Sequence, residues 1–293
     1  MQPLIVASVK SVISYCVLFA VGPVRHTLLQ GDGVWGVTTL DNLIYVLRNK
    51  ESEQIAVYDT DSYRLQRKIT VRHLTTVNDM VACPHYWCLY VSGVNDQWLH
   101  RVALLDDKVT NWHADGMPQF LSVTDTHSLL VTYRKRREIK EFSTDGELLR
   151  QIQLPQDIVS PVHTIQLSSG EFLVCHGNRD DPLHRVCLID SDGHTVKSFG
   201  GPVGSGSQQM DVPAHLAVDR NGFVFVADVN NDRVLLLSPA LTFVREVLSG
   251  EQLKLRPLRL RLDSDRCRLY VAVNKLQGDD TSGQVVVLAS SYV

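Results

Sequence analysis

The stretch Val196–Ser238, VKSFGGPVGSGSQQMDVPAHLAVDRNGFVFVADVNNDRVLLLS, decides the fold. After VKSF it has a Gly/Ser/Pro-rich connector, Gly200–Asp211, and it continues as short apolar segments rich in β-branched and aromatic residues, which is the composition of buried strands. The turn signals DRNG and NND separate these segments, because Asn and Gly tolerate a positive φ. Such a meander cannot bury its own faces, so it predicts neighbours of the same kind. The predicted strands are 214–218, 223–227 and 233–237.

The apolar centre of this meander recurs along the chain. The segment that ends at Val226 has five counterparts, LIYV, LYV, LLV, FLV and LYV, which end at Val46, Val91, Val131, Val174 and Val271. Successive ends are separated by 45, 40, 43, 52 and 45 residues. A period in the forties with several short strands per unit is typical of a β-propeller blade. The sequence therefore predicts an all-β, six-bladed β-propeller of four-stranded antiparallel blades. The blades are expected at 34–71, 76–112, 117–154, 161–199, 212–247 and 256–290.

The fifth unit also carries a family motif. The run VPAHLAVD from Val212 to Asp219, then Gly222, the VAD of 226–228 and the NDRV of 231–234, resembles the NHL repeat. The other units match it mainly in their strands and spacing, and the resemblance covers about residues 24–293. It implies a propeller like the C-terminal domain of TRIM-NHL proteins. In those proteins the propeller recruits protein or RNA partners, while a separate RING carries ubiquitin-ligase activity.

The chain divides into two parts. Residues 1–23 form an apolar segment for which three interpretations remain, a secretory signal, a membrane anchor, or a linker or remnant. Residues 24–293 form the propeller. Within it, Val24–Gln30 has a strand-like pattern, whereas the last unit ends near Leu288 with little chain after it. We therefore expect Val24–Gln30 to close the ring as the outermost strand of the sixth blade, which leaves no open seam.

Composition limits the possible partners and the compartment. The 293 residues are 44% hydrophobic and 21% charged, with a net charge of −3, so no global attraction to DNA or to an anionic membrane is expected. Membrane contact would require residues 4–24 to anchor the chain. The six cysteines include no C-x-x-C pair, which argues against a zinc ribbon or a RING finger. The chain also has no N-x-[ST] sequon, which favours a cytoplasmic protein over the secreted or membrane-tethered alternative.

A cluster of four consecutive cations, RKRR, lies at a predicted hairpin tip between the second and third strands of blade three. Like charges in such a tip repel one another, so we expect them to stay solvated and available. Equivalent loops of other blades add further cations. These loops share one face, which is predicted to bind an acidic protein segment or the phosphates of single-stranded RNA. The alternative is a solvated turn without a partner. The candidate residues are Arg134, Lys135, Arg136, Arg137, Arg48, Lys50, Arg179 and Lys275.

His163 and His215 occupy matching positions at the starts of two inner strands, which converge on the central channel of a propeller. Two such histidines could share a metal, as the resemblance to peptide-amidating lyases, which are also related to NHL propellers, implies. A catalytic zinc needs about three protein ligands, however, and Arg259 at a matching position would repel it. Asp79 is the one acid at these positions, which argues against a lactonase of the regucalcin type. We therefore expect histidines bonded to backbone or water, and neither a metal nor another cofactor.

Two further observations complete the sequence-based hypothesis. Asp228, Asn231 and Arg233 are spaced to form a local hydrogen-bonded brace, which is a structural role. The chain shows no G-x-S-x-G, no phosphate-binding Gly-rich loop and no H-E-x-x-H motif, so it is predicted not to be an enzyme. The expected function is non-catalytic recognition of protein or RNA. The alternative is a secreted or membrane-tethered propeller enzyme with a channel metal.

Overall fold

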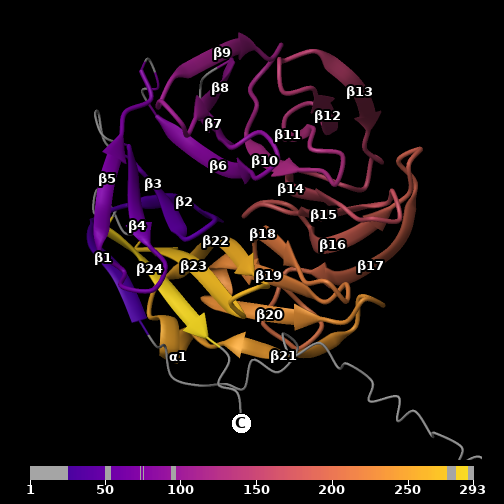
Figure 1. Cartoon of the computed structure of the whole chain (residues 1–293). Helices are drawn as coiled ribbons and strands as arrows, with labels where there is room; N and C mark the ends of the chain where they lie inside the picture. The colour runs from indigo at the N-terminus through magenta and orange to yellow at the C-terminus, as the bar shows by residue number, and fades with distance from the viewer. Residues whose placement is uncertain are drawn as a thin grey trace, which may run out of the picture.

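The computed structural model describes residues 26–49, 54–72, 74, 76–93, 97–275 and 282–289. Figure 1 shows six blades arranged as a ring around a central axis. Each blade is a four-stranded antiparallel sheet; in five of them the strands follow one another in chain order from the axis outward, and in the sixth the outermost strand comes from the N-terminal end of the described chain. The prediction of a six-bladed, all-β propeller is thus confirmed. No helix in the described ranges is long and apolar enough to cross a membrane, and residues 1–23 lie outside them, so their interpretations stay predictions.

The first three blades take up the first half of the ring. Blade 1 comprises β2 (Val34–Leu40), β3 (Leu43–Arg48), β4 (Ile55–Asp59) and β5 (Leu65–Ile69). Blade 2 comprises β6 (Val77–Cys83), β7 (Cys88–Gly93), β8 (Trp98–Ala103) and β9 (Val109–His113). Blade 3 comprises β10 (Phe120–Val123), β11 (Leu129–Tyr133), β12 (Glu138–Phe142) and β13 (Leu148–Gln153).

The remaining blades follow the same plan. Blade 4 comprises β14 (Pro161–Gln166), β15 (Phe172–His176), β16 (Leu183–Ile189) and β17 (Thr195–Pro202). Blade 5 comprises β18 (Pro213–Val218), β19 (Val224–Asp228), β20 (Arg233–Leu237) and β21 (Phe243–Leu248), with a short 3-10 turn, η2 (Val229–Asn231). Blade 6 comprises β22 (Arg256–Asp263), β23 (Arg268–Asn274), β24 (Ser282–Ala289) and β1 (His26–Asp32), and the helical turn α1 (Gly250–Leu253) precedes it.

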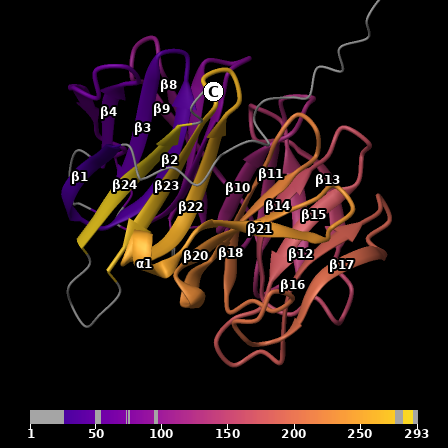
Figure 2. The same ribbon diagram turned by 90° about the horizontal axis from the view of Figure 1, so that it is seen from below.

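The ring closes between the two ends of the chain. In Figures 1 and 2 the indigo strand β1 lies along the yellow strand β24, and the antiparallel register runs from His26 opposite Val287 to Asp32 opposite Ser282. The closing strand was predicted at residues 24–30; it runs to Asp32, and residues 24 and 25 lie outside the described part. Next to this closing strand, blade 6 is also tied to blade 1, because the amide of Asn274 bonds both backbone groups of Val34, at 2.8 and 3.0 Å.

The core lies between the blades. The middle strands are buried on both faces; all five residues of β19 are buried, for example, including Val226. This burial explains the near-continuous apolar runs of the repeat, because each blade packs against a neighbour on either side. The outermost strands, such as β5, keep most of their side chains at the surface.

The inner strands share one irregularity near their beginnings. In five of them the pairing with the second strand slips within the first few residues, as between Pro213 and His215 or between Pro257 and Arg259. A β-bulge bends the strand locally and changes the direction of the next side chain. The bulges lie at the matching positions expected to face the axis, and they determine the geometry of the candidate site.

Candidate functional site

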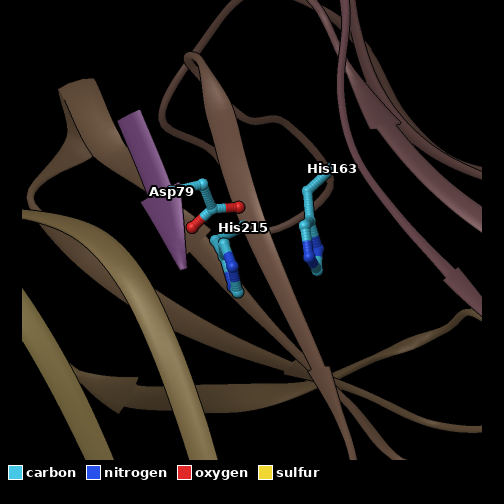
Figure 3. Close-up of side chains that lie close together, drawn as sticks. All are labelled: Asp79, His163 and His215. Atoms are coloured by element: carbon cyan, nitrogen blue, oxygen red, sulfur yellow. The ribbon is translucent and has the colours of Figure 1, made fainter. Parts of the chain in front are cut away.

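Three ionisable side chains from three different inner strands meet near the axis. Figure 3 shows Asp79 of β6, His163 of β14 and His215 of β18 close together, with the two imidazoles side by side and Asp79 next to His215. Their candidate ligand atoms all lie within 4.8 Å of one another. All three side chains are buried, at 1%, 2% and 8% exposure. The bulges therefore bring together the two histidines singled out in the sequence and the acid at the equivalent position in blade 2.

The two histidines are neutral and bonded to the backbone. Their rings stack with centroids 3.8 Å apart. The Leu216 N–H donates to Nδ1 of His163 at 3.3 Å, so the ring proton sits on Nε2, which lies 3.2 Å from the Leu121 carbonyl. The Leu260 N–H donates to Nδ1 of His215 in the same way, at 3.4 Å. Burial lowers the pKa of His163 to about 3, and burial together with His163 holds the pKa of His215 well below its usual value.

Asp79 has a different set of partners, headed by a buried arginine. Its Oδ1 accepts from Nε of Arg259 at 2.9 Å, and its Oδ2 accepts from the Leu121 N–H at 2.9 Å. The same guanidinium also donates to the carbonyls of Leu258 and Asn78, at 3.0 and 2.6 Å. Burial raises the pKa of Asp79, while the cation and the N–H oppose that shift. The histidine bonds and the Leu121 N–H join adjacent blades, whereas the bonds of Arg259 to Asp79 and Asn78 connect blade 6 to blade 2 past blade 1, so the cluster ties blades together around the axis.

The donor set resembles a metal site, but each of its candidate ligand atoms already has a hydrogen-bond partner or carries a proton. Two histidines and one carboxylate are a known ligand set for divalent iron. Both nitrogens of His163 and both oxygens of Asp79 are engaged, however, and the remaining nitrogen of His215 carries the proton. Arg259 adds a cation next to the carboxylate. In this arrangement the cluster does not fit a metal ion, and we derive no metal chemistry from it.

The basic turn at 134–137, between β11 and β12, does not form one solvated patch. Arg134 folds back over the ring of Phe120, with its guanidinium carbon 5.4 Å from the ring centre, and burial lowers its pKa. Arg136 forms ion pairs with Asp115 at 3.1 Å and with Glu138 at 3.5 Å. The expectation that all four cations stay solvated and available is therefore wrong for Arg134, which is partly buried over Phe120, and for Arg136, which is exposed but already paired with acids.

The physical reason is the tight hairpin. Arg137 adopts a left-handed φ of 51°, and its side chain donates to the Gln156 carbonyl at 3.2 Å. The turn thereby sends its side chains in different directions, toward the axis, toward the connector before blade 3, and toward the connector before blade 4. Lys135 stays exposed to solvent.

The other cations that the sequence assigned to this face have different surroundings. Arg48 forms an ion pair with Asp32 of the closing strand and so supports the ring seam. Arg179 is exposed in the loop between β15 and β16. Lys275 is exposed just after β23, and its backbone N–H bonds the Ser282 carbonyl at 2.8 Å. Lys50 lies outside the described residues. Partner binding by these residues stays a prediction.

The brace expected in blade 5 is present. Nδ2 of Asn231 and Nε of Arg233 both donate to Oδ2 of Asp228, each at 2.8 Å. The guanidinium of Arg233 also donates to the carbonyls of Ser205 and Gln209, at 2.8 and 2.9 Å. The Gly/Ser-rich connector is thus held by three residues of the NHL-like motif, whose role here is structural.

One feature was missed in the sequence, a cleft of about 610 Å³ at the other end of the axis. It lies where β2 and β22 end, on the face opposite the 134–137 turn, and Arg261 lines it. A signal for it exists in β22. Arg259 and Arg261 alternate with apolar residues, and a period of two places both side chains on the axis-facing side of the strand.

Comparison with known proteins shows the fold and no family. No family model matches the chain, and no curated protein matches it. Among similar solved structures is virginiamycin B lyase from Staphylococcus aureus, with 11% identity over 87% of each chain and a TM-score of 0.61. The PQQ-bound aldose sugar dehydrogenase from Streptomyces coelicolor has 13% identity over 90% of this chain and 97% of its own, with a TM-score of 0.63. A chain of a nidogen/laminin complex has 12% identity over 78% of this chain and 84% of its own, with a TM-score of 0.61.

These similar structures bear on two predictions, that the chain is not an enzyme and that it resembles the propeller of TRIM-NHL proteins. The prediction that the chain is not an enzyme is contradicted. It relied on the absence of catalytic motifs, but structures with this fold include a lyase and a dehydrogenase. At 11–13% identity the likeness shows the fold, and none of these activities passes to this chain. A β-propeller is likewise confirmed, whereas membership of the TRIM-NHL proteins in particular is not.

Proposed function

We propose that this chain is a protein-binding propeller of NHL type, and that it binds an acidic segment of its partner beside the 134–137 turn. The observation that carries the proposal is the state of Arg134. Its Nε is buried without a hydrogen-bond partner, its guanidinium lies over Phe120, and in the described ranges it forms no ion pair, although the charge of Asp181 acts on it. A desolvated cation of this kind gains from a carboxylate that approaches from solvent. Exposed Lys135 next to it would attract the same partner.

Two points favour a protein over RNA. Single-stranded RNA binds grooves that combine a continuous track of cations with exposed aromatic rings for base stacking. Here Asp115 and Glu138 neutralise Arg136 within the turn, and Phe120 is 6% exposed beneath Arg134. The nidogen/laminin neighbour was solved as a complex of proteins, which supports a protein partner for this fold in general.

The test is direct binding of the full chain to a short glutamate-rich peptide, with a single-stranded RNA of similar charge as the competing probe. The double variant Arg134→Gln with Lys135→Glu is expected to weaken peptide binding about tenfold or more, equivalent to about 1.4 kcal/mol. The matched control is Lys108→Glu, an exposed lysine in the turn between β8 and β9, on the opposite face, and it should bind as the unaltered chain does. The proposal would be contradicted if the full chain bound RNA more tightly than the peptide. It would also be contradicted if the double variant bound the peptide as tightly as the Lys108→Glu control does.

A further inference from the structure

A second candidate site lies on the face opposite the 134–137 turn. The cleft of about 610 Å³ is enclosed by the end of β2, the turn between β6 and β7, and the end of β22. Its volume falls in the range of small-molecule pockets, about 300–1,000 Å³. Blades 6, 1 and 2 all contribute to it, so it exists only when the ring is closed.

The key residue of the cleft is Arg261. Its Nε donates to Oγ1 of Thr39 at 2.9 Å, and one Nη donates to the Thr39 carbonyl at 3.3 Å. Among the described residues it forms no ion pair with a carboxylate, although burial lowers its pKa. Its charge is thus partly removed from water and is not offset by a bound acid. An anion that reached the remaining edge of the guanidinium would gain a charge-assisted hydrogen bond.

The acids that line the cleft limit the charge of such an anion. Asp263 accepts from the backbone N–H and a guanidinium nitrogen of Arg266, at 3.1 and 3.3 Å. Asp265 pairs with Arg220 at 2.5 Å. Asp41 stays exposed at the rim. With Asp263 and Asp265 paired to arginines, Asp41 at the rim and the residual charge of the paired acids still disfavour a doubly charged phosphate, whereas a single carboxylate directed at Arg261 suits the balance.

An aromatic wall stands beside the arginine. Trp87 lines the cleft and is 40% exposed, and its neighbour Tyr86 is 39% exposed. The turn is well held, because the Leu104 N–H donates to the Trp87 carbonyl at 3.0 Å and the ring of His85 stacks on His127 with centroids 4.1 Å apart. An indole fixed at the edge of a cleft offers a flat apolar surface to a planar ligand.

We propose that this cleft binds a small aromatic carboxylate, whose acid group bonds Arg261 and whose ring packs on Trp87. The assignment differs from the proposed protein-binding function in its face, its residues and its ligand. The aspartates that line the cleft favour a ligand with one negative charge over a ligand with two. The indole of Trp87 favours a planar ring over an aliphatic one.

The proposal predicts how a set of related probes ranks on the full chain. Benzoate should bind, as measured by chemical-shift changes or Trp fluorescence, while uncharged benzamide, cyclohexanecarboxylate and inorganic phosphate should each bind about tenfold more weakly or not at all. Equal binding of benzoate and benzamide would overturn the role of the charge. Equal binding of benzoate and cyclohexanecarboxylate would overturn the role of the indole.

Variants then locate the site. Arg261→Gln should reduce benzoate affinity at least about tenfold, and Trp87→Leu should reduce it severalfold, while Lys135→Gln on the opposite face should change nothing. Asp41→Asn should increase benzoate affinity, because it removes a negative charge from the rim. If Arg261→Gln fails to fold, Arg261→Lys retains the charge without the planar fork and should bind benzoate more weakly. Unchanged affinity in the arginine and Asp41 variants would place the binding elsewhere and refute the assignment.

Discussion

Arg259 and Arg261 lie two residues apart on the same strand and on the same side of it, yet their surroundings differ. Arg259 is 4% exposed, pairs with Asp79 at 2.9 Å and donates to two carbonyls. Within the described part of the chain, Arg261 bonds the hydroxyl and the carbonyl of Thr39 alone, and it opens onto a cleft. The first arginine completes a closed set of bonds at one end of the axis, whereas the second keeps a donor edge available at the other end.

The difference shows how one propeller can hold structural and binding arginines in the same strand. A buried cation with an acid and two carbonyls has its bonding capacity met inside the protein, so it stabilises the ring. A partly buried cation without an acid has unused capacity, which a ligand can meet. Arg134, with its unpartnered Nε, belongs with Arg261 in this respect.

The largest expected change in stability concerns the Asp79–Arg259 pair. Arg259→Met should leave the carboxylate of Asp79 buried without its cation and should lower the free energy of unfolding by about 3–5 kcal/mol. Urea denaturation measures this loss. The double variant Asp79→Leu with Arg259→Met removes both charges and should recover most of it. A double variant as unstable as the single one would show that the pair is not the main source of stability there.

A somewhat smaller loss is expected at the brace of blade 5. Arg233→Met removes charge-assisted bonds to Asp228 and to carbonyls of the connector, at about 1.5–3 kcal/mol in total. Limited proteolysis should then cut within residues 204–209 faster than in the unaltered chain, where Arg233 holds this segment. Connector cleavage at the same rate in both proteins would argue against the brace.

The stacked histidines predict a pH dependence of stability. Their pKa values are lowered in the folded protein, to about 3 for His163, against 6.5 in an unfolded chain. The unfolded state therefore binds more protons below pH 6.5, so stability is complete above that pH and falls as the pH drops toward 3. The slope approaches about 1.4 kcal/mol per pH unit for each histidine. Urea titrations at several pH values measure it, and His163→Gln should reduce the slope, whereas a profile that stays flat would mean the rings are not neutral and buried.

The smallest change in stability is expected at Arg261, beside the cleft. Arg261→Met loses two hydrogen bonds to Thr39 but also removes an unpaired, partly desolvated charge, so the net change in unfolding free energy should be about 1 kcal/mol or less. The same urea experiment compares it with Arg259→Met. A loss as large as that of Arg259→Met would make Arg261 a structural residue and remove the contrast between the two.

Much of this arrangement was predictable from the sequence. The repeat ending at Val226 and its counterparts indicated six blades, and the strand pattern near residue 24 indicated the closing strand. The positions of Asp79, His163 and His215 at the inner-strand starts followed from the same alignment of repeats. The brace of blade 5 also followed, because all its members lie within six residues. Each of these features depends on local periodicity or on short spacing, which a linear pattern records directly.

The tertiary structure decided which partners each candidate side chain has and how much of it is exposed. Asp79 and Arg259 are 180 residues apart and meet only because the ring closes. Asp115 reaches Arg136 from a neighbouring connector, and the sequence pattern of the basic turn contains no sign of that pair. The cleft beside Arg261 needs three blades and the 40% exposed Trp87 at its edge. The repeat pattern determines on which face of the propeller a side chain lies. Whether that side chain meets an opposite charge depends on distances between blades, and only the folded chain sets these distances.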